Sequence, residues 1–159
     1  MTDERVQERE DRGWVVRDRI AKLEALRERG IEPYAYSFDR THSAAEAVDL
    51  LPQGAEEGER VRVAGRLVAL RTMGKSTFAH IADRSGRIQL YFRVNDLGKD
   101  VYSLLDLLDL GDWVGVQGPV FRTRTGEVTV RVERLEPLAK AVRPLPLGKE
   151  EVDAETGER

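Results

Sequence analysis

The feature that most constrains the fold of this chain is a change in hydrophobic period at Arg60. Before this residue, apolar side chains recur every three or four residues, which is typical of an amphipathic helix. After it they alternate with polar ones, so that Val61, Val63 and Leu67 fall on one side of an extended strand. This change of period predicts a mainly β domain preceded by a helix.

Turn residues divide the alternating region into five predicted strands. Met73-Gly74-Lys75 follows the first strand, Arg84-Ser85-Gly86 the second and Arg124-Thr125-Gly126 the fourth. Residues 95–110, between the third and fourth strands, return to helical spacing, with Asn95 or Asp96 as the cap. Five strands, with a helix between the third and the fourth, is the order of elements in an OB-fold barrel. The predicted strands run from Arg60 to the first turn and then over 76–83, 86–94, 112–123 and 127–138.

An amphipathic helix is predicted over residues 14–29, where one stripe is apolar. Gly30 ends this helix, and Pro33 prevents it from continuing. The polar residues 1–12 are expected to fray, and residues 43–51 predict a short helix within a connector. The apolar stripe consists of Val16, Ile20, Leu23 and Leu26.

The charge of the chain differs among its three predicted parts. Residues 1–59, the N-terminal helix and connector, carry 15 acidic and 9 basic side chains. Residues 60–140, the predicted barrel, carry 9 acidic and 14 basic ones, whereas residues 141–159, a proline-containing linker and acidic tail, carry 5 and 3. A basic middle between acidic flanks indicates an anionic partner, and nucleic acid is the candidate. The alternative is a solvated surface with ordinary ion pairs.

The composition excludes several classes of site. There is no cysteine, which excludes disulfides, thiol nucleophiles and cysteine-type zinc sites. The two histidines, His42 and His80, are too few to favour a histidine metal site or a catalytic triad. No apolar run approaches the roughly 20 residues of a membrane span, and residues 1–20 are too charged for a signal peptide. We therefore expect a cytoplasmic protein without a metal site or a membrane association.

Alternation also assigns side chains to the two faces of the second and third strands. If Ala79, Ile81 and Leu90 point into the core, the residues between them point outward. An aromatic ring on which a base stacks, beside an amide and a guanidinium that read its edge, suits single-stranded nucleic acid. The predicted outer face carries Phe78, His80, Arg87, Gln89 and Tyr91.

The two loops that border this face in OB folds carry further candidates. Arg71 and Lys75 lie between the first and second strands, and Arg124 and Glu127 lie between the fourth and fifth. An acidic Glu127 among basic residues predicts a hydrogen-bond acceptor for a base edge.

Each candidate also has a simpler interpretation. Phe78 is a core residue if the parity of its strand is reversed, and Tyr91 covers the rim of the barrel. His80 packs or titrates as a neighbour, Glu127 is a turn residue without a partner, and the loop cations only keep the surface solvated.

Six segments of the sequence resemble the N-terminal anticodon-binding region of class II lysyl-tRNA synthetases, over residues 14–146 in total. The Met-Gly-Lys turn and the Arg-Pro-Leu-Pro exit look like the lysyl branch, whereas aspartyl and asparaginyl synthetases share the barrel. The segments are LEALRERGIEPYAY at 23–36, THS at 41–43, VAGRLVALRTMGK at 63–75, GRIQLY at 86–91, TRTGE at 123–127 and AVRPLP at 141–146.

The resemblance implies roles for four of the candidates. Phe78 matches the aromatic residue that stacks on an anticodon base. Gln89 and Arg71 match the pair that hydrogen-bonds the central uridine, and Glu127 matches the acceptor for a flanking uridine. The implied partner is therefore a tRNA with the lysine anticodon. The family's N-terminal helix adds contacts to the tRNA backbone, but its charge is mixed here rather than basic.

The resemblance also implies what this chain does not do alone. No segment matches the motifs with which the family binds ATP and lysine, so we expect no catalytic residues, no cofactor and no aminoacylation from this chain. ATP and magnesium would act elsewhere in the parent enzyme, which is expected to be a homodimer. The Arg-Pro-Leu-Pro exit is typical of a linker into a further domain, so we expect a fragment. A free-standing OB-fold module that binds RNA or protein is the alternative.

Overall fold

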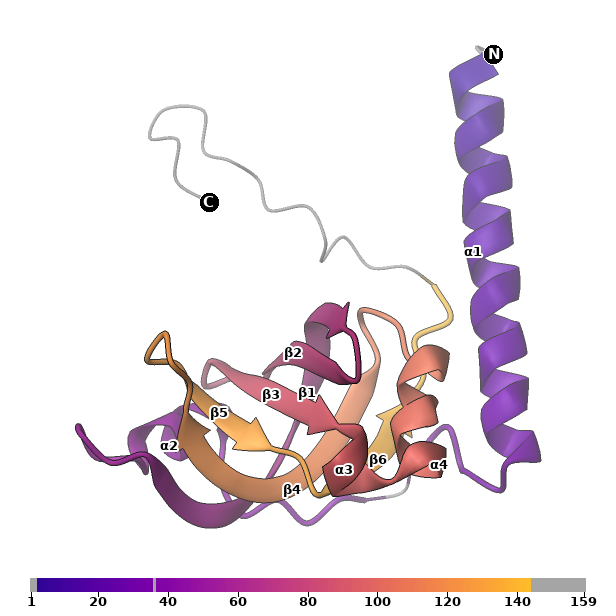
Figure 1. The fold of residues 1–159 in the computed structure, drawn as a ribbon. Helices are drawn as coiled ribbons and strands as arrows, with labels where there is room; N and C mark the ends of the chain where they lie inside the picture. Colours follow the sequence, from indigo (N-terminus) through magenta and orange to yellow (C-terminus); the bar gives the residue numbers. More distant parts are fainter. Residues whose placement is uncertain (1–2, 36, 144–159) are drawn as a thin grey trace, which may run out of the picture.

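The computed structural model describes residues 3–35 and 37–143, and its centre is a closed β-barrel (Figure 1). The strands pair in the order β1-β2-β3-β5-β4-β6, and a further pairing of β1 with β4 closes the ring. The β3–β5 pairing is parallel and the others are antiparallel. The strands are β1 (Glu57–Met73), β2 (Ser76–Ala82), β3 (Arg87–Arg93), β4 (Trp113–Arg122), β5 (Val128–Arg131) and β6 (Arg134–Ala139). The predicted OB-fold barrel is confirmed.

Helices lie before the barrel and between its third and fourth strands, as predicted (Figure 1). The short helix in the connector begins at Ser43, which forms a capping box with Glu46. The helices are α1 (Asp3–Glu28), α2 (Ala44–Asp49), α3 (Val94–Leu97), α4 (Lys99–Tyr102) and the 3-10 helix η1 (Ser103–Leu107). Residues 144–159, which make up most of the predicted linker and tail, lie outside the described residues.

The core of the barrel is built from the inward side chains of β1 to β5. β3 alternates as predicted, since Ile88, Leu90 and Phe92 are at most 1% exposed. Ala79 and Ile81 of β2 face them and are equally buried. The parity predicted for these two strands is therefore confirmed, and the interpretation of Phe78 as a core residue is wrong.

β1 changes the face of its side chains at a β-bulge between Leu67 and Ala69. Leu67 pairs with the buried Ile81, whereas Ala69 pairs with His80. Because directly opposed residues point to the same side of a sheet, Ala69 lies on the outer face. The alternation that begins at Val61 therefore does not continue through Ala69. The same bulge places Arg71, whose orientation the simple alternation leaves open, on the outer face.

The predicted fifth strand is divided into β5 and β6, which both pair with β4. The division lies opposite Gly118 and Pro119. A Cβ atom on Gly118 would come within 1.8 Å of the Arg131 carbonyl oxygen, and Pro119 has no N–H to donate. The extra residue is accommodated because Val132 N–H donates to the Tyr91 carbonyl at 2.9 Å, and Glu133 N–H donates to Gln117 at 2.8 Å. One continuous strand is thereby replaced by two.

The helix predicted over residues 95–110 is broken into α3, α4 and η1. Gly98 has a φ of 80°, a left-handed conformation that ends α3 after one turn. The helical segment begins at Val94, after Arg93, and not at the predicted caps Asn95 or Asp96. Leu104, Leu105 and Leu108 are nevertheless buried, so this segment still covers one end of the barrel.

The first helix, α1, is longer than predicted and presents a different face to the barrel. It begins at Asp3, within the segment that was expected to fray, and it rises along one side of the molecule (Figure 1). Leu23 and Leu26 are buried as predicted, but Ile20 is 42% exposed and Arg19 only 8%. The predicted apolar stripe is therefore wrong at Ile20, because polar contacts decide how the helix is rotated.

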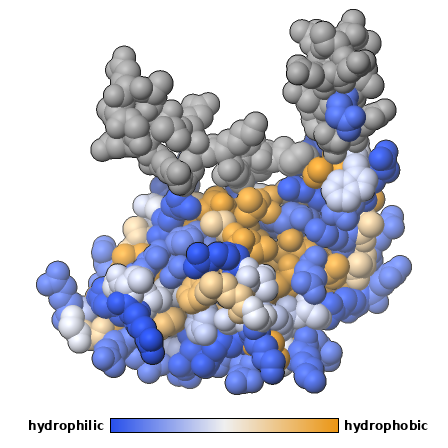
Figure 2. Space-filling model, turned by 45° about the horizontal axis from the view of Figure 1, so that its top comes forward, coloured by the Kyte–Doolittle hydropathy of each residue, from blue (hydrophilic) through white to orange (hydrophobic). Residues whose placement is uncertain are grey.

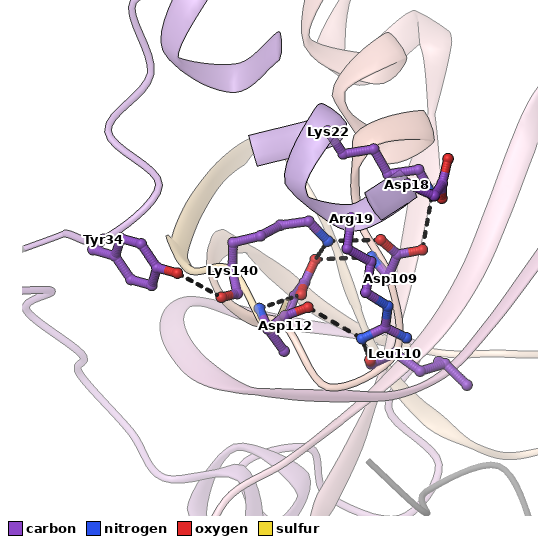
Figure 3. A network of polar contacts seen from close by, with 9 residues as sticks. Asp18, Arg19, Lys22, Tyr34, Asp109, Leu110, Asp112 and Lys140 are labelled. Atoms are coloured by element: carbon purple, nitrogen blue, oxygen red, sulfur yellow. Dashed lines mark hydrogen bonds and ion pairs between the residues drawn. The ribbon is translucent and has the colours of Figure 1, made fainter. Parts of the chain in front are cut away.

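A cluster of charged residues joins α1 to the end of the barrel (Figure 3). Lys140 Nζ lies 2.7 Å from both Asp109 Oδ2 and Asp112 Oδ2, and the Lys140 and Asp112 side chains are only 1% exposed. From α1, Lys22 Nζ donates to Asp109 Oδ1 at 2.8 Å, and Arg19 donates to the carbonyl oxygens of residues 110 and 141. We call the five residues Arg19, Lys22, Asp109, Asp112 and Lys140 the charge cluster.

The charge cluster should make the stability of the protein sensitive to acid. Burial raises the pKa of Asp109, but hydrogen bonds from Lys140 and Lys22 outweigh it and hold this pKa below 3.8. As pH falls, the Asp109 carboxylate is therefore protonated at a higher pH in the unfolded chain than in the folded one. The contribution of Asp109 to the free energy of unfolding is lost as the pH falls through its lowered pKa. Urea unfolding at neutral and at acidic pH should show a smaller acid-induced loss in Asp109→Asn than in the parent. An equal loss in both proteins would contradict this assignment.

The hydropathy of the surface varies around the barrel. In the view of Figure 2, apolar side chains gather on the upper side of the barrel next to α1, and hydrophilic ones surround them. Trp14 of α1 is 63% exposed. None of the helices in the described residues has the length and apolar character that a membrane crossing requires.

Candidate nucleic-acid interface

The outer face of the barrel carries two rows of side chains that the strand register sets side by side. Opposed residues of β1, β2, β3 and β5 form each row, and opposed residues share a face. We call the first the aromatic row, which consists of Arg71, Phe78, Tyr91 and Arg131. We call the second the amide row, which consists of Ala69, His80, Gln89 and Thr129.

Two aromatic rings stack at the centre of the aromatic row. The ring centroids of Phe78 and Tyr91 are 4.7 Å apart and their planes are 25° apart. A pocket of about 240 Å³ adjoins Phe78, and we call it the Phe78 pocket. Its lining comes from both rows and consists of Ala69, Leu70, Arg71, Phe78, His80 and Gln89. The pocket therefore combines a fixed ring with an amide and a guanidinium.

Gln89 is held in one orientation by its neighbour in the amide row. The single hydroxyl hydrogen of Thr129 faces Gln89 Oε1 at 2.9 Å, with the Glu127 carbonyl oxygen at 3.2 Å as a second acceptor, and Thr129 is itself fully buried. This contact leaves the amide N–H groups of Gln89 without a partner among the described residues. Arg71 is exposed, and its guanidinium likewise has no partner there. The pocket therefore offers hydrogen-bond donors, which suit the carbonyl oxygens of a base.

Glu127 reaches the same surface from the loop between β4 and β5. His80 Nε2 lies 2.7 Å from Glu127 Oε1, and the two side chains are 26% and 46% exposed. The interpretation of Glu127 as a turn residue without a partner is therefore wrong. His80 is a neighbour that holds Glu127, and it also lines the Phe78 pocket.

The other predicted residues lie around this pocket rather than in it. Arg87 is paired with Ala82, one step along the strands beyond the amide row. Lys75 lines a smaller depression of about 190 Å³ together with Tyr91. Arg124 lies in the loop between β4 and β5 and lines a third pocket, which also includes Tyr91.

Three residues of the outer face were not predicted: Phe121, Thr129 and Arg131. Their signal in the sequence is the same alternation that assigns β2 and β3. Val128 and Val130 point into the core, so Thr129 and Arg131 lie on the opposite side of β5, where Thr129 is covered by its neighbours. Phe121 pairs with Thr129 and extends the amide row onto β4.

The described residues contain no group of three or more histidine, aspartate or glutamate side chains placed to hold a metal ion. The closely packed carboxylates of the charge cluster are bound by lysine ammonium groups instead.

Comparison with known proteins relates the barrel to a family of nucleic acid binding domains. Residues 61–138 match the tRNA anticodon family of OB-fold nucleic acid binding domains. Over 132 residues, 83% of the chain, it is 50% identical to the lysine–tRNA ligase of Carboxydothermus hydrogenoformans. It is 49% identical over 137 residues to that of Pelotomaculum thermopropionicum, and 46% identical over 133 residues to that of Enterococcus faecalis. In each case the chain spans 27% of the length of the ligase. The chain thus belongs to the lysyl-tRNA synthetase family, as its OB-fold anticodon-binding domain.

Proposed function

We propose that this chain binds the anticodon loop of tRNA and reads the uridine-rich lysine anticodon. The observation that carries the proposal is the Phe78 pocket, in which the strand register places a ring, an amide and a guanidinium on one surface. Stacking on an aromatic side chain contributes roughly 1–3 kcal/mol per base. A base held on Phe78 would present its edge to Gln89 and Arg71.

The chemistry of the pocket favours uracil over cytosine. Uracil carries a carbonyl oxygen where cytosine carries an amino group, so the two bases offer an acceptor and a donor at the same position. The N–H groups of Gln89 and Arg71 pair with the acceptor and not with the donor. Glu127, which His80 holds at 2.7 Å, supplies an acceptor for the N–H of a flanking uridine.

In a longer parent enzyme, the chain would position tRNA for esterification with lysine. ATP and magnesium would then act in parts of the polypeptide outside this chain, and the parent would work as a homodimer in the cytoplasm. Support comes from the lysine–tRNA ligases of which the chain spans 27%.

Two other functions make different predictions. A protein-interaction module derived from the synthetase would bind RNA weakly and without preference for an anticodon. A general single-strand binder would accept any pyrimidine-rich strand, with an affinity that only follows the salt concentration. The paired Glu127 and the oriented Gln89 favour base reading, since indifferent binding does not need them.

The test is a fluorescence anisotropy titration with a lysine anticodon stem-loop, beside one whose central uridine is cytidine. Both are titrated at two salt concentrations. A preference for uridine that persists at the higher salt concentration is expected, because hydrogen bonds to the base do not depend on released counterions. Equal binding of the two loops would overturn the proposed anticodon reading.

Gln89→Ala should reduce the preference for the central uridine about tenfold, since one good base contact contributes roughly 1–3 kcal/mol of discrimination. The same pair of titrations measures it. Gln117→Ala is the matched control, because Gln117 lies in β4 beside a pocket lined by Phe38 and Arg62. If Gln89→Ala keeps the preference of the parent protein, Gln89 does not read the base.

A further inference from the structure

The chain leaves the barrel after β6, and the backbone of the first residue beyond that strand is bound on both sides. Lys140 N–H donates to the Pro33 carbonyl oxygen at 3.0 Å, and the Tyr34 hydroxyl donates to the Lys140 carbonyl oxygen at 3.1 Å. The pairing of β6 with β4 ends at Ala139, so this sheet pairing does not supply these contacts. The segment between α1 and α2 therefore binds the chain where the sheet has ended.

The backbone of Ala141 is bound by two charged side chains, Arg19 and Asp112 (Figure 3). Ala141 N–H donates to Asp112 Oδ1 at 2.8 Å. Arg19 Nη1 donates to the Ala141 carbonyl oxygen at 3.1 Å and to the Leu110 carbonyl oxygen at 3.2 Å. Arg19 and Asp112 are buried, so water competes little for these bonds. All four backbone groups of residues 140 and 141 are thus bound, and we call the residues that bind them the exit clamp: Arg19, Pro33, Tyr34 and Asp112.

The exit clamp does something different from the ion pairs of the charge cluster. Lys140 neutralises the buried carboxylates through its side chain, whereas the clamp binds backbone groups. Backbone beyond the last element of a domain is poorly ordered unless it is tied down. Here it is tied down by α1, by the segment between α1 and α2, and by the segment before β4. Contacts from three separate segments fix the direction of the backbone as well as its position.

We propose that the exit clamp sets the direction in which the chain leaves the barrel, with Arg19 and Tyr34 as positioning residues. In a longer lysine–tRNA ligase, this direction would orient the anticodon-binding face relative to the part of the polypeptide that follows the barrel. A tRNA held by its anticodon reaches a reacting group elsewhere only if the two sites are held in a matching geometry. This consequence rests on the proposed function, and it gives α1 a role at the exit of the chain.

The test measures the direction of the exit by double electron–electron resonance. Because the chain has no cysteine, Glu59→Cys and Arg143→Cys together carry the only two spin labels. Both positions are exposed. Glu59 lies in the part of β1 that pairs with the end of β4, whereas the exit lies next to Trp113 at its start. The parent pair should give one narrow distribution of distances, because the second label lies only two residues beyond the clamped Ala141.

Tyr34→Phe and Arg19→Met, each introduced into the doubly labelled chain, should broaden the distribution, since each releases one carbonyl oxygen of the exit. Arg17→Met is the matched control for Arg19→Met, because Arg17 is exposed on α1. Tyr34→Phe removes only a hydroxyl from a side chain that is 45% exposed, so it tests the clamp even if Arg19→Met does not fold.

Lys22→Met separates the direction of the exit from the stability of the fold. Lys22 ties α1 to Asp109 at 2.8 Å but contacts no backbone group of the exit. This variant should lower the free energy of unfolding and leave the distribution of distances narrow. Broadening equal to that of Arg19→Met would show that the exit depends on the docking of α1 as a whole, and the clamp would be wrong.

A broad distribution in the parent chain, or a distribution that Tyr34→Phe and Arg19→Met leave unchanged, would also overturn the proposal. The anticodon titrations are independent of these distances. If uridine is preferred but the parent distribution is broad, the proposed function stands and the fixed exit is wrong. If the distribution depends on the clamp but uridine is not preferred, the fixed exit stands, and its role in orienting an anticodon-binding face is lost with the proposed function.

Discussion

Lys140→Met is expected to lower the free energy of unfolding by roughly 3–5 kcal/mol, the usual cost of removing one partner from a buried ion pair. Lys140 Nζ contacts two carboxylates at 2.7 Å, and its side chain and that of Asp112 are 1% exposed. Without the ammonium, the carboxylate of Asp112 remains buried among hydrogen bonds from the backbone N–H groups of residues 109 and 141. Urea unfolding, followed by circular dichroism, measures the change.

Lys99→Met is the matched control for Lys140→Met, because Lys99 is exposed in α4 and should tolerate the same substitution with little change in stability. Adding Asp112→Asn to Lys140→Met should restore part of the loss, since the buried negative charge is removed while an oxygen acceptor remains. Unfolding of Lys140→Met at the same urea concentration as the parent would show that the charge cluster does not stabilise the fold.

Phe78→Ala is expected to weaken binding of the lysine anticodon stem-loop by roughly 1–3 kcal/mol, or about 5- to 150-fold in affinity, through lost stacking. Phe78 lies on the outer face and stacks on Tyr91, so its removal leaves the barrel core intact. The anisotropy titration that tests the proposed function measures the loss. Phe78→Tyr keeps the ring and should bind nearly as well as the parent.

Phe38→Ala provides the matched aromatic deletion. Phe38 lies against Gly115 and under the Arg62 guanidinium, in a pocket that shares no residue with the pockets on the outer face. Its loss should leave RNA affinity unchanged. If Phe78→Ala binds the stem-loop as tightly as Phe38→Ala does, no base stacks on Phe78.

The barrel could be predicted from the sequence because apolar and polar residues alternate in its strands and glycine turns separate several of them. The same rule fails where the backbone inserts a residue. At the bulge after Leu67 the alternation reverses, so that Ala69 and Arg71 face outward, and opposite Gly118 the last strand divides. Such irregularities depend on how neighbouring strands pair, which a single strand does not encode.

The outer face was partly predictable for the same reason. Phe78, Gln89 and Tyr91 follow from the parity of two strands, but their contacts with Thr129 and Phe121 depend on the β3–β5 and β4–β5 pairings. The rotation of α1 was not predictable, because an apolar stripe favours Ile20 whereas the contacts of Arg19 and Lys22 with the far end of the chain decide the buried side.

These helix contacts also imply an order of events during synthesis. Arg19 binds carbonyl oxygens that lie 91 and 122 residues further along the chain, and Lys22 binds a carboxylate 87 residues away. During synthesis, α1 is therefore completed long before these three partner residues are made. Domains otherwise tend to fold from the N-terminus onward. The contacts of Lys22 and Arg19 can therefore form only after residues 109 and 110 have been made, and the last of them only after residue 141.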